Sequence, residues 1–280
     1  MHIDTTESAF YVHAMPDEVS TCIKLGLRRQ KSGLYRTDNW SLASRFSYYA
    51  DRDAARALNR WTPRSNEAPT VPMSPAPVGL SYMPHQEVGI RFWLQHQRVL
   101  IADSPRVGKS PQAIGGCESL RLNANYRRFL VISPTAGGVM LPTWQREIRT
   151  WTGGLHAPII NSGSGRNKVL VDQSHDGYYV INYDILQRFL PELLQWLSAT
   201  ESAIIIDEAH LIKNPEAQRS QACKQLIEAA DRACFLTGTP APNSLKESFY
   251  LFNMVSEEHF DSWQYHVENL ERYSHLFMIR

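Results

Sequence analysis

The sequence predicts an α/β protein in which a small α+β domain precedes a parallel sheet with helices on both faces. Three observations predict this organisation. Beyond residue 79, short apolar segments alternate with helical patterns, as in chains that build parallel sheets from strand–helix–strand units. Residues 63–78 hold five prolines, which favour an extended linker. Ahead of that linker, residues 1–62 carry strand and hairpin patterns of their own.

The composition is that of a globular chain without a strong overall charge. The chain has 280 residues, 43% of them hydrophobic, and 29 basic residues against 28 acidic ones. A nucleic-acid partner would therefore need a local basic patch. No segment has the length of a membrane span, and the amino terminus lacks a secretory pattern. We expect a soluble, cytoplasmic protein with no membrane partner, of a kind that would suit a phage or a bacterium.

The cysteines show no metal-binding spacing. The four are Cys22, Cys117, Cys223 and Cys234. Without a Cys-x-x-Cys pair, the pattern indicates reduced thiols rather than a structural zinc or a disulfide framework.

The small module, residues 1–62, contains several short elements. The segment "FYVHAM" predicts a strand, and Pro16 to Leu25 predicts a helix. The segment "LRRQKSGLYR" predicts a hairpin that turns at residues 31–33. Two short helices are expected near Ser41 and Asp51.

Basic residues gather on this hairpin. They are Arg28, Arg29, Lys31 and Arg36, with Tyr35 and Trp40 near them in the sequence. Basic residues interleaved with aromatic ones suit a DNA junction or a single strand. The alternative is a charged hairpin that only solvates one face of a small fold.

Residues 79–256 are expected to form the large α/β domain. Its predicted strands are "RVLIA", "RFLVIS", "APIIN", "YYVINY", "AIIID" and "ACFLTG". Trp144, Ile148 and Trp151 share one helical stripe and are interpreted as core residues rather than site residues. Cys223, Leu226, Ile227 and Ala230 form a second such stripe. Pro191 is expected to break the helix around it, which would restart with Pro191 in its first turn.

The segment "RVLIADSPRVGKSPQAI" predicts a strand, a loop and the start of a helix. A turn of this kind, with Gly108 at its end, aims backbone N–H groups and a helix amino terminus at phosphates. Lys109 would contact the β and γ phosphates, and Ser110 would bind Mg²⁺. The general P-loop pattern has a glycine where this chain has Asp103, so the segment alone also fits an ordinary strand-to-helix connection.

A second apolar strand ends on two carboxylates, which complements a phosphate loop. Asp207 would hold Mg²⁺, and Glu208 would orient and deprotonate the attacking water. The next strand ends at Thr237, Gly238 and Thr239, which are expected at the same edge of the sheet. There, the threonine hydroxyl groups could respond to the γ-phosphate through the imidazole of His210. The candidate catalytic residues are thus Lys109, Asp207, Glu208 and His210.

This ordered set of motifs resembles the first RecA-like lobe of superfamily-two helicases, and within them the Swi/Snf (Snf-two) family of DNA-dependent ATPases. "IADSPRVGKSPQAI" resembles motif I, "VISPTAGGVMLPTWQREIRTW" motif Ia, "IIIDEAHLIKN" the DEAH-box motif II, and "LTGTPAPNSLKESFYLFNMV" motif III. "YMPHQEVGIRF" resembles the family's adenine-reading segment. The resemblance implies ATP and Mg as cofactors. The nucleotide-binding residues it implies are Gln86, Arg106, Val107, Gly108, Lys109, Ser110 and Gln112.

The chain departs from the family in two respects. An acid at the position of Asp103 is a family feature, but Ser104-Pro105 replace the usual Glu-Met and Arg106 replaces a glycine. Residues 257–280 resemble the start of a connection to the family's second lobe, and no counterpart of that lobe follows. In the family, the second lobe supplies arginines, each worth about 10³ to 10⁵ in rate. The resemblance therefore implies slow or no turnover without a second RecA-like lobe.

The resemblance also implies that the first lobe holds the backbone of one strand of double-stranded DNA. The positions implied are Pro134, Thr135, Gly137, Gly138, Asn182, Tyr183, Asp184, Lys213 and Asn214. Contacts of this kind are independent of base sequence and sensitive to salt. Asp184 could instead be a helix N-cap. The amino-terminal module resembles the small domain of HepA-related annealing helicases, which recognises forked DNA.

The function expected is that of an ATP-binding lobe of an enzyme, a DNA-dependent ATPase that translocates on double-stranded DNA or remodels and reanneals it. Two alternatives stay open. One is a nucleotide-gated DNA-binding module without catalysis of its own, and the other is another superfamily-two translocase, such as a restriction-type one.

Overall fold

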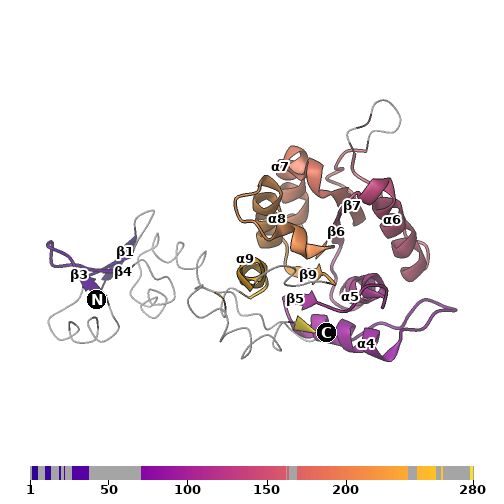
Figure 1. Cartoon of the computed structure of the whole chain (residues 1–280), viewed down its shortest axis with the longest axis horizontal. Helices are drawn as coiled ribbons and strands as arrows, with labels where there is room; N and C mark the ends of the chain where they lie inside the picture. The colour runs from indigo at the N-terminus through magenta and orange to yellow at the C-terminus, as the bar shows by residue number, and fades with distance from the viewer. Residues whose placement is uncertain are drawn as a thin grey trace. The chain divides into compact units, whose positions relative to one another are not determined.

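The computed structural model divides the chain into two units, Met1–Arg64 and Ser65–Arg280 (Figure 1). It describes residues 2–5, 10–13, 19, 22, 27–37, 71–161, 163, 169–238, 245–256, 260 and 278–279. The predicted helix over Pro16 to Leu25 lies outside the described residues apart from two helical positions, 19 and 22. Outside them too lie the short helices expected near Ser41 and Asp51, and both Trp40 and Thr239.

An antiparallel sheet organises the first unit. Its strands are β1 (His2–Thr5), β2 (Phe10–His13), β3 (Arg28–Arg29) and β4 (Tyr35–Thr37), in the order β1-β2-β4-β3. The predicted strand at "FYVHAM" and the predicted hairpin are confirmed. The hairpin turns at Lys31, Ser32 and Gly33, and Gly33 takes the left-handed φ of 87° that the turn requires.

A six-stranded parallel sheet forms the centre of the second unit. Its strands are β5 (Arg98–Ile101), β6 (Arg128–Ser133), β7 (Gly177–Asn182), β8 (Ser202–Ile206), β9 (Arg232–Leu236) and β10 (Met278–Ile279). The order is β10-β5-β9-β8-β6-β7, and every neighbouring pair is parallel. The strand that ends at the two carboxylates is therefore separated from the strand of the phosphate loop by β9.

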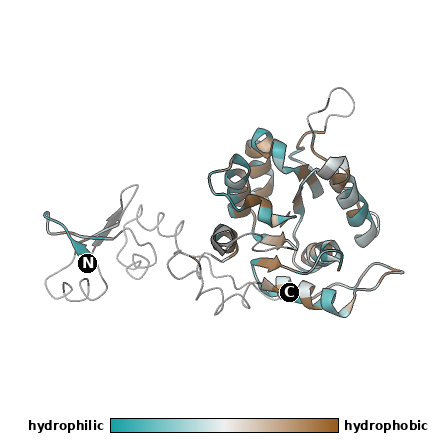
Figure 2. Ribbon diagram, viewed as in Figure 1, coloured by the Kyte–Doolittle hydropathy of each residue, from teal (hydrophilic) through white to brown (hydrophobic). Residues whose placement is uncertain are grey.

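Helices cover both faces of this sheet, as the sequence predicts (Figure 1). They are α4 (Pro84–Gln95), α5 (Lys109–Asn123), α6 (Met140–Trp151), α7 (Leu186–Leu197), α8 (Gln218–Ala229) and α9 (Leu245–Val255). Alternate strand residues enter two separate cores. In β8, Ala203 and Ile205 pack toward α4, α5 and α6, whereas Ile204 and Ile206 pack toward α7, α8 and α9. Figure 2 shows the hydrophobic stretches along the strands that supply these cores.

Two local expectations are wrong. "APIIN" does not form a strand of the sheet; it makes only isolated bridges, Ile159 to Val180 and Asn161 to Val169. Pro158 has no N–H for a ladder, although its carbonyl accepts from Val180. Pro191 does not break its helix but lies inside α7, on the exposed side. There, water can solvate the carbonyl that the ring leaves without a helical donor.

The second unit extends beyond the boundaries expected for it. At its carboxyl end, β10 pairs with β5, and the Ala102 N–H donates to the Ile279 carbonyl at 2.8 Å. At its amino end, residues 71–78 of the proline-rich segment lie along α5. The Ser119 hydroxyl accepts from the Ser74 N–H at 2.9 Å, and the Asn123 side chain donates to the Pro72 carbonyl at 2.8 Å. These residues belong to the surface of the large domain.

Arginines at the starts of three strands bind the carboxyl ends of three helices. Arg98 donates to the Met254 carbonyl of α9 at 2.9 Å, and Arg128 donates to the Trp196 carbonyl of α7 at 2.6 Å. Arg232 donates to the carbonyls of Trp93, Leu94 and His96 at the end of α4, at 3.2, 3.0 and 3.2 Å. Each cation satisfies carbonyls that a helix end leaves without partners and complements the negative end of its dipole.

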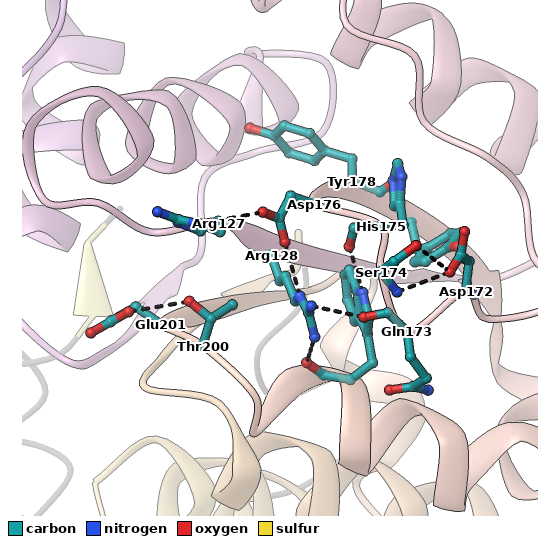
Figure 3. A network of polar contacts seen from close by, with 12 residues as sticks. Arg127, Arg128, Asp172, Gln173, Ser174, His175, Asp176, Tyr178, Thr200 and Glu201 are labelled. Atoms are coloured by element: carbon teal, nitrogen blue, oxygen red, sulfur yellow. Dashed lines mark hydrogen bonds and ion pairs between the residues drawn. The ribbon is translucent and has the colours of Figure 1, made fainter.

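Figure 3 shows the contacts of Arg128. Arg128 also donates to Asp176 at 3.2 Å and to the Gln173 carbonyl at 2.8 Å, and its guanidinium lies over the Trp196 ring. The Trp196 indole donates in turn to the His175 carbonyl at 2.7 Å. The amino-terminal edge of the sheet is thus held by a network around the buried Arg128, away from the edge where the candidate catalytic residues lie.

The four cysteines are buried as thiols. Burial raises the pKa of Cys117, Cys223 and Cys234, so these thiols are protonated at neutral pH. Among the helices that the structure describes, none is long and apolar enough to cross a membrane.

Candidate functional site at the carboxyl edge of the sheet

The predicted catalytic residues lie at the carboxyl-terminal edge of the parallel sheet. The register pairs Ile101 of β5 with Leu236 of β9, and Ile206 of β8 with both Phe235 and Ile132. The residues that follow these positions therefore leave the sheet side by side. Ligands of open parallel sheets bind at this edge, where loops and helix amino termini converge.

The predicted phosphate loop, residues 102–108, joins β5 to α5 and has two residues in left-handed backbone conformation. Gly108, at the N-cap of α5, has φ 90°, and Arg106 has φ 69°. Arg106 thus adopts the conformation that the glycine usual in the family would allow, at a cost of about 1 to 2 kcal/mol. Lys109 donates to the carbonyls of Asp103 and Ser104, at 2.9 and 3.0 Å. The lysine amine lies against the loop that would surround a phosphate.

Gln86 connects α4 with this loop. Its side-chain oxygen accepts from the Met83 N–H at 2.9 Å, and its amide nitrogen donates to the carbonyls of Val107 and Gly108, at 3.4 and 3.5 Å. His85 also contacts the Val107 carbonyl, at 2.9 Å. Gln86 therefore connects the start of α4 with the end of the loop between β5 and α5.

Gln112 differs from its predicted role. It is 1% exposed, and its amide nitrogen donates to the Asp103 carboxylate at 2.7 Å. Its oxygen points toward Gly89, where a Cβ would lie only 1.8 Å away. Gln112 thus holds the loop through Asp103 instead of facing a nucleotide, and it gives Asp103 a specific partner.

Asp207 and Glu208 follow β8 in different environments. Asp207 is 7% exposed; its Oδ2 accepts from the Ser133 hydroxyl and from the Trp144 indole N–H, both at 2.8 Å. Its Oδ1 accepts from the Glu208 N–H at 3.0 Å. Glu208 is partly exposed and has a left-handed φ of 48°. Strained backbone of this kind concentrates at functional sites.

His210 connects Glu208 with the end of β9. Its Nδ1 lies 3.2 Å from Glu208 Oε2 and 3.3 Å from the Thr237 hydroxyl. The next residue, Gly238, lies against the phosphate loop, because a Cβ there would be 3.0 Å from the Pro105 ring. The structure therefore brings together the carboxylate, the imidazole, the hydroxyl and the phosphate loop that the motifs predict.

Among the predicted DNA contacts, the glycine-containing loop after β6 is exposed. Gly137 and Gly138 have φ of 71° and 86°, and no atom lies within 4 Å of a Cβ placed on either. Pro134 and Thr135 precede them and are partly exposed. The open loop leaves room for a phosphate to approach its backbone.

The loop after β7 is arranged differently from its prediction. Tyr183 is 4% exposed and donates its hydroxyl to the Asp207 carbonyl at 2.5 Å, so its side chain is not a surface contact. Burial raises the pKa of this tyrosine well above its usual value. The helix cap is Asn182, whose oxygen accepts from the N–H groups of Asp184 and Ile185, and not Asp184. Asp184 itself is exposed.

The remaining candidates lie on two further surfaces. Lys213 is partly exposed, and the exposed Asn214 accepts from the Glu216 N–H at 3.0 Å, which forms a local turn. On the hairpin of the first unit, Arg28, Arg29 and Lys31 are exposed. Tyr35 is 2% exposed, so its ring is not available for stacking on a base.

Sequence reasoning missed Ser133 and placed Trp144 only in a core stripe. Trp144 is buried as expected, yet its N–H donates to the candidate metal-binding acid. The single available signal was that a buried indole N–H needs an acceptor. Neither periodicity nor motif spacing indicates which acceptor it finds.

The residues present fit ATP with Mg²⁺. The fifteen-residue helix α5 begins at the loop, with Lys109 and Ser110 as its first residues. The Ser110 hydroxyl and Asp207 Oδ1 are hard oxygen donors of the kind that Mg²⁺ takes, partly through water. Over the described part of the chain, no cluster of three His, Cys, Asp or Glu side chains indicates another metal site.

Comparisons with known proteins agree with this geometry. A model of the SNF2-related domain matches residues 80–275. Human chromodomain-helicase-DNA-binding protein 1 is 30% identical over 194 residues, which cover 66% of this chain and 11% of that protein. From Xenopus tropicalis, the SWI/SNF-related matrix-associated actin-dependent regulator of chromatin subfamily A-like protein 1 is 31% identical over 182 residues, covering 62% of this chain and 18% of that protein.

One solved structure shows the same fold. A Sulfolobus solfataricus SWI2/SNF2 ATPase core in complex with double-stranded DNA superposes with a TM-score of 0.56 at 22% identity. The match covers 72% of this chain and 41% of that chain. The likeness confirms the RecA-like class of the large domain. Of the curated relatives named, this chain spans only 11% and 18% of the length.

Proposed function

The chain belongs to the SNF2-related domain family, and from that premise we propose that it is the nucleotide-binding lobe of a DNA-dependent ATPase. The observation that carries this proposal is the continuous set of contacts at one sheet edge. It runs from Gln86 to the phosphate loop, from Pro105 of that loop to Gly238, and from Thr237 through His210 to Glu208. Such an arrangement can place an acid and a cation on either side of a transferred phosphoryl group.

In this proposal, Lys109 exchanges the carbonyls of Asp103 and Ser104 for the β and γ phosphates. Ser110 and Asp207 hold Mg²⁺, which when bound neutralises charge on the phosphates. Glu208 orients a water and takes its proton, and its partly exposed position lets water reach it. Gln86 borders the adenine.

We further propose that the partner is double-stranded or forked DNA, held through its backbone. The open loop at Gly137 and Gly138 supports this, as does the complex with double-stranded DNA in which the Sulfolobus neighbour was solved. Phosphate contacts would be independent of base sequence. Remodelling or reannealing of duplex DNA is the activity that such a grip would serve.

Fast turnover in this proposal requires a second RecA-like lobe, because arginines from that lobe would neutralise the transition state. Such an arginine is worth about 10³ to 10⁵ in rate. ATP hydrolysis by the 280-residue chain is therefore expected to be slow. It should rise with forked duplex DNA only when a second lobe is supplied, in the same polypeptide or as a separate domain.

The proposal is tested by comparing Lys109→Ala with Glu208→Gln. Lys109→Ala should abolish binding of a fluorescent ATP analogue, whereas Glu208→Gln should bind it normally and abolish turnover in the two-lobed enzyme. Lys224→Ala and Glu228→Gln, which remove a surface ion pair of α8, are matched controls. Equal loss of affinity in Lys109→Ala and Glu208→Gln would contradict the assigned roles. Rapid turnover by the short chain would contradict the need for a second lobe.

A further inference from the structure

One oxygen atom of the Asp207 side chain receives both of its buried hydrogen bonds from the same stretch of chain. Oδ2 accepts from the Ser133 hydroxyl and from the Trp144 indole N–H, each at 2.8 Å. Ser133 and Trp144 are both buried, so water does not compete for these bonds. Hydrogen bonds to a carboxylate are the strong, geometrically demanding kind.

The two donors bracket the exposed loop. Ser133 is the last residue of β6, and Trp144 lies at the start of the second turn of α6. Between them run Pro134 to Val139, with the two left-handed glycines and open space around them. Ser133 precedes this loop directly, and Trp144 lies on α6, the helix that begins directly after it, so a shift of the loop can be transmitted to both donors.

The other oxygen has limited capacity left. A carboxylate offers about four acceptor positions. Oδ2 uses two, and Oδ1 accepts from the Glu208 N–H. The acceptor position that remains on Oδ1 would be available to a water bound to Mg²⁺, and the two bonds to Oδ2 fix the rotation of the carboxylate.

A second segment reaches the same residue from another strand. Tyr183, in the loop after β7, donates to the backbone carbonyl of Asp207. The chain leaving β8 is therefore held by side chains from β6, α6 and the β7 loop together. A purely stabilising role would need only that the buried acid be satisfied; it would not need both donors to flank the exposed loop.

We propose that Ser133 and Trp144 are positioning residues that link a DNA phosphate at loop 134–138 to the orientation of the Asp207 carboxylate. Binding of duplex DNA and binding of Mg²⁺ with nucleotide are then coupled through one oxygen atom. This inference rests on the proposed function and names how DNA regulates that site. Trp144 acts through Asp207 and does not touch the nucleotide.

The test measures the affinity of the chain for a non-hydrolysable ATP analogue with Mg²⁺, in the presence and absence of a short DNA duplex. Linkage requires that the duplex change this affinity, and that the analogue change the affinity for the duplex by the same factor. We expect a change of at least about fivefold in the natural chain. Trp144→Phe keeps an aromatic ring but loses the donor, and Ser133→Ala loses the other donor; both should reduce the factor to about one, within about twofold.

The matched control is Trp151→Phe in the same helix, where the indole donates to Glu147 at 3.2 Å instead. Trp151→Phe should keep the coupling factor of the natural chain. In the absence of nucleotide, all three variants should bind the duplex with the affinity of the natural chain. The Trp144 indole N–H resonance, identified by its loss in Trp144→Phe, should move when duplex DNA is added without nucleotide. A merely structural tryptophan would give an unchanged signal.

The outcomes separate the inference from the proposed function. Coupling that persists in both donor variants, or that disappears equally in Trp151→Phe, overturns the inference. A natural chain that binds both ligands without coupling also overturns it while leaving the proposed function intact. A natural chain that fails to bind nucleotide or duplex overturns both. Thermal unfolding shows whether each variant is folded. If Trp144→Phe is not folded, the coupling factor of Ser133→Ala alone tests the inference.

Discussion

Gln86 and Gly108 lie directly against each other: a Cβ placed on Gly108 would be 2.2 Å from the Gln86 amide nitrogen. The same nitrogen donates to the carbonyls of Val107 and Gly108. Position 108 therefore demands glycine twice, for its left-handed φ of 90° and for the space that the side chain of Gln86 occupies. The start of α4 and the phosphate loop form one fitted surface.

Gly108→Ala should lower nucleotide affinity at least tenfold, because the added methyl group displaces Gln86 and strains the loop. Gly79→Ala is the matched control, since Gly79 has a φ of 85° and no atom within 4 Å of its Cβ position. That control should lose about 1 kcal/mol of stability from the φ alone and keep its nucleotide affinity. Titration with a fluorescent ATP analogue measures the affinity of both variants; unchanged affinity in Gly108→Ala would contradict the assignment of this loop.

The left-handed conformation of Arg106, at φ 69°, should lower the stability of the native state by about 1 to 2 kcal/mol. Arg106→Gly and Arg106→Ala both remove the charge, but only glycine removes the conformational cost. The free energy of unfolding, from urea titration, should be higher for the glycine variant than for the alanine variant by about 1 kcal/mol. Equal stabilities would show that the loop relaxes to another φ without the arginine.

Arg232→Met should lower the free energy of unfolding by about 3 kcal/mol. Arg232 is 3% exposed, and its removal leaves the carbonyls at the end of α4 without their donor. Arg127→Met is the control, because Arg127 is largely exposed and its ion pair with Asp176 is 3.7 Å long. Surface pairs of this kind contribute under about 1 kcal/mol. Chemical denaturation measures both, and similar losses of stability would show that the buried arginine is not a specific cap.

Arg28 and Arg36 should contribute to DNA binding by the small module. They lie directly opposite each other in the β3–β4 pair, and Arg36 is also opposite Tyr11 of β2. Adjacent like charges on one face are destabilising unless an anion lies between them. The double variant Arg28→Ala, Arg36→Ala should reduce the slope of log affinity against log salt by about 1.8, because each phosphate that is no longer neutralised accounts for about 0.9. Arg127→Ala should leave the slope unchanged. An unchanged slope in the double variant would favour the alternative, in which the charged hairpin only solvates one face of the small module.

Much of the large domain could be predicted from its sequence, because strands buried on both faces appear as continuous apolar runs and their ends carry motif residues. "AIIID" and "ACFLTG" became β8 and β9, followed by Asp207 and Thr237. "APIIN" carries the same apolar signal but lies at the open edge of β7, where only single bridges form. An apolar segment predicts that its residues are buried. It does not predict which strand the segment pairs with, because the order of strands in the sheet depends on the tertiary structure.

The side-chain partners within the site were less predictable than its members. Motif spacing placed Asp207, Glu208 and His210 together at one edge, but it did not indicate Tyr183 beneath Asp207 or Gln112 on Asp103. Tyr183 had been assigned to DNA and Gln112 to the nucleotide, because the resemblance to the family holds for whole segments. A matching segment does not indicate which of its side chains point into the protein. β10 was missed because two residues are too short to show a period.

The pairing of β10 with β5 has a mechanical consequence. The Ile279 carbonyl accepts from the Ala102 N–H, at the first residue of the loop that leads to Lys109. A force on the chain at Ile279 would load this parallel pair in shear and act directly on Ala102. A pulling force at β10 would therefore act on the loop through one strand pair, without passing through β9 and β8.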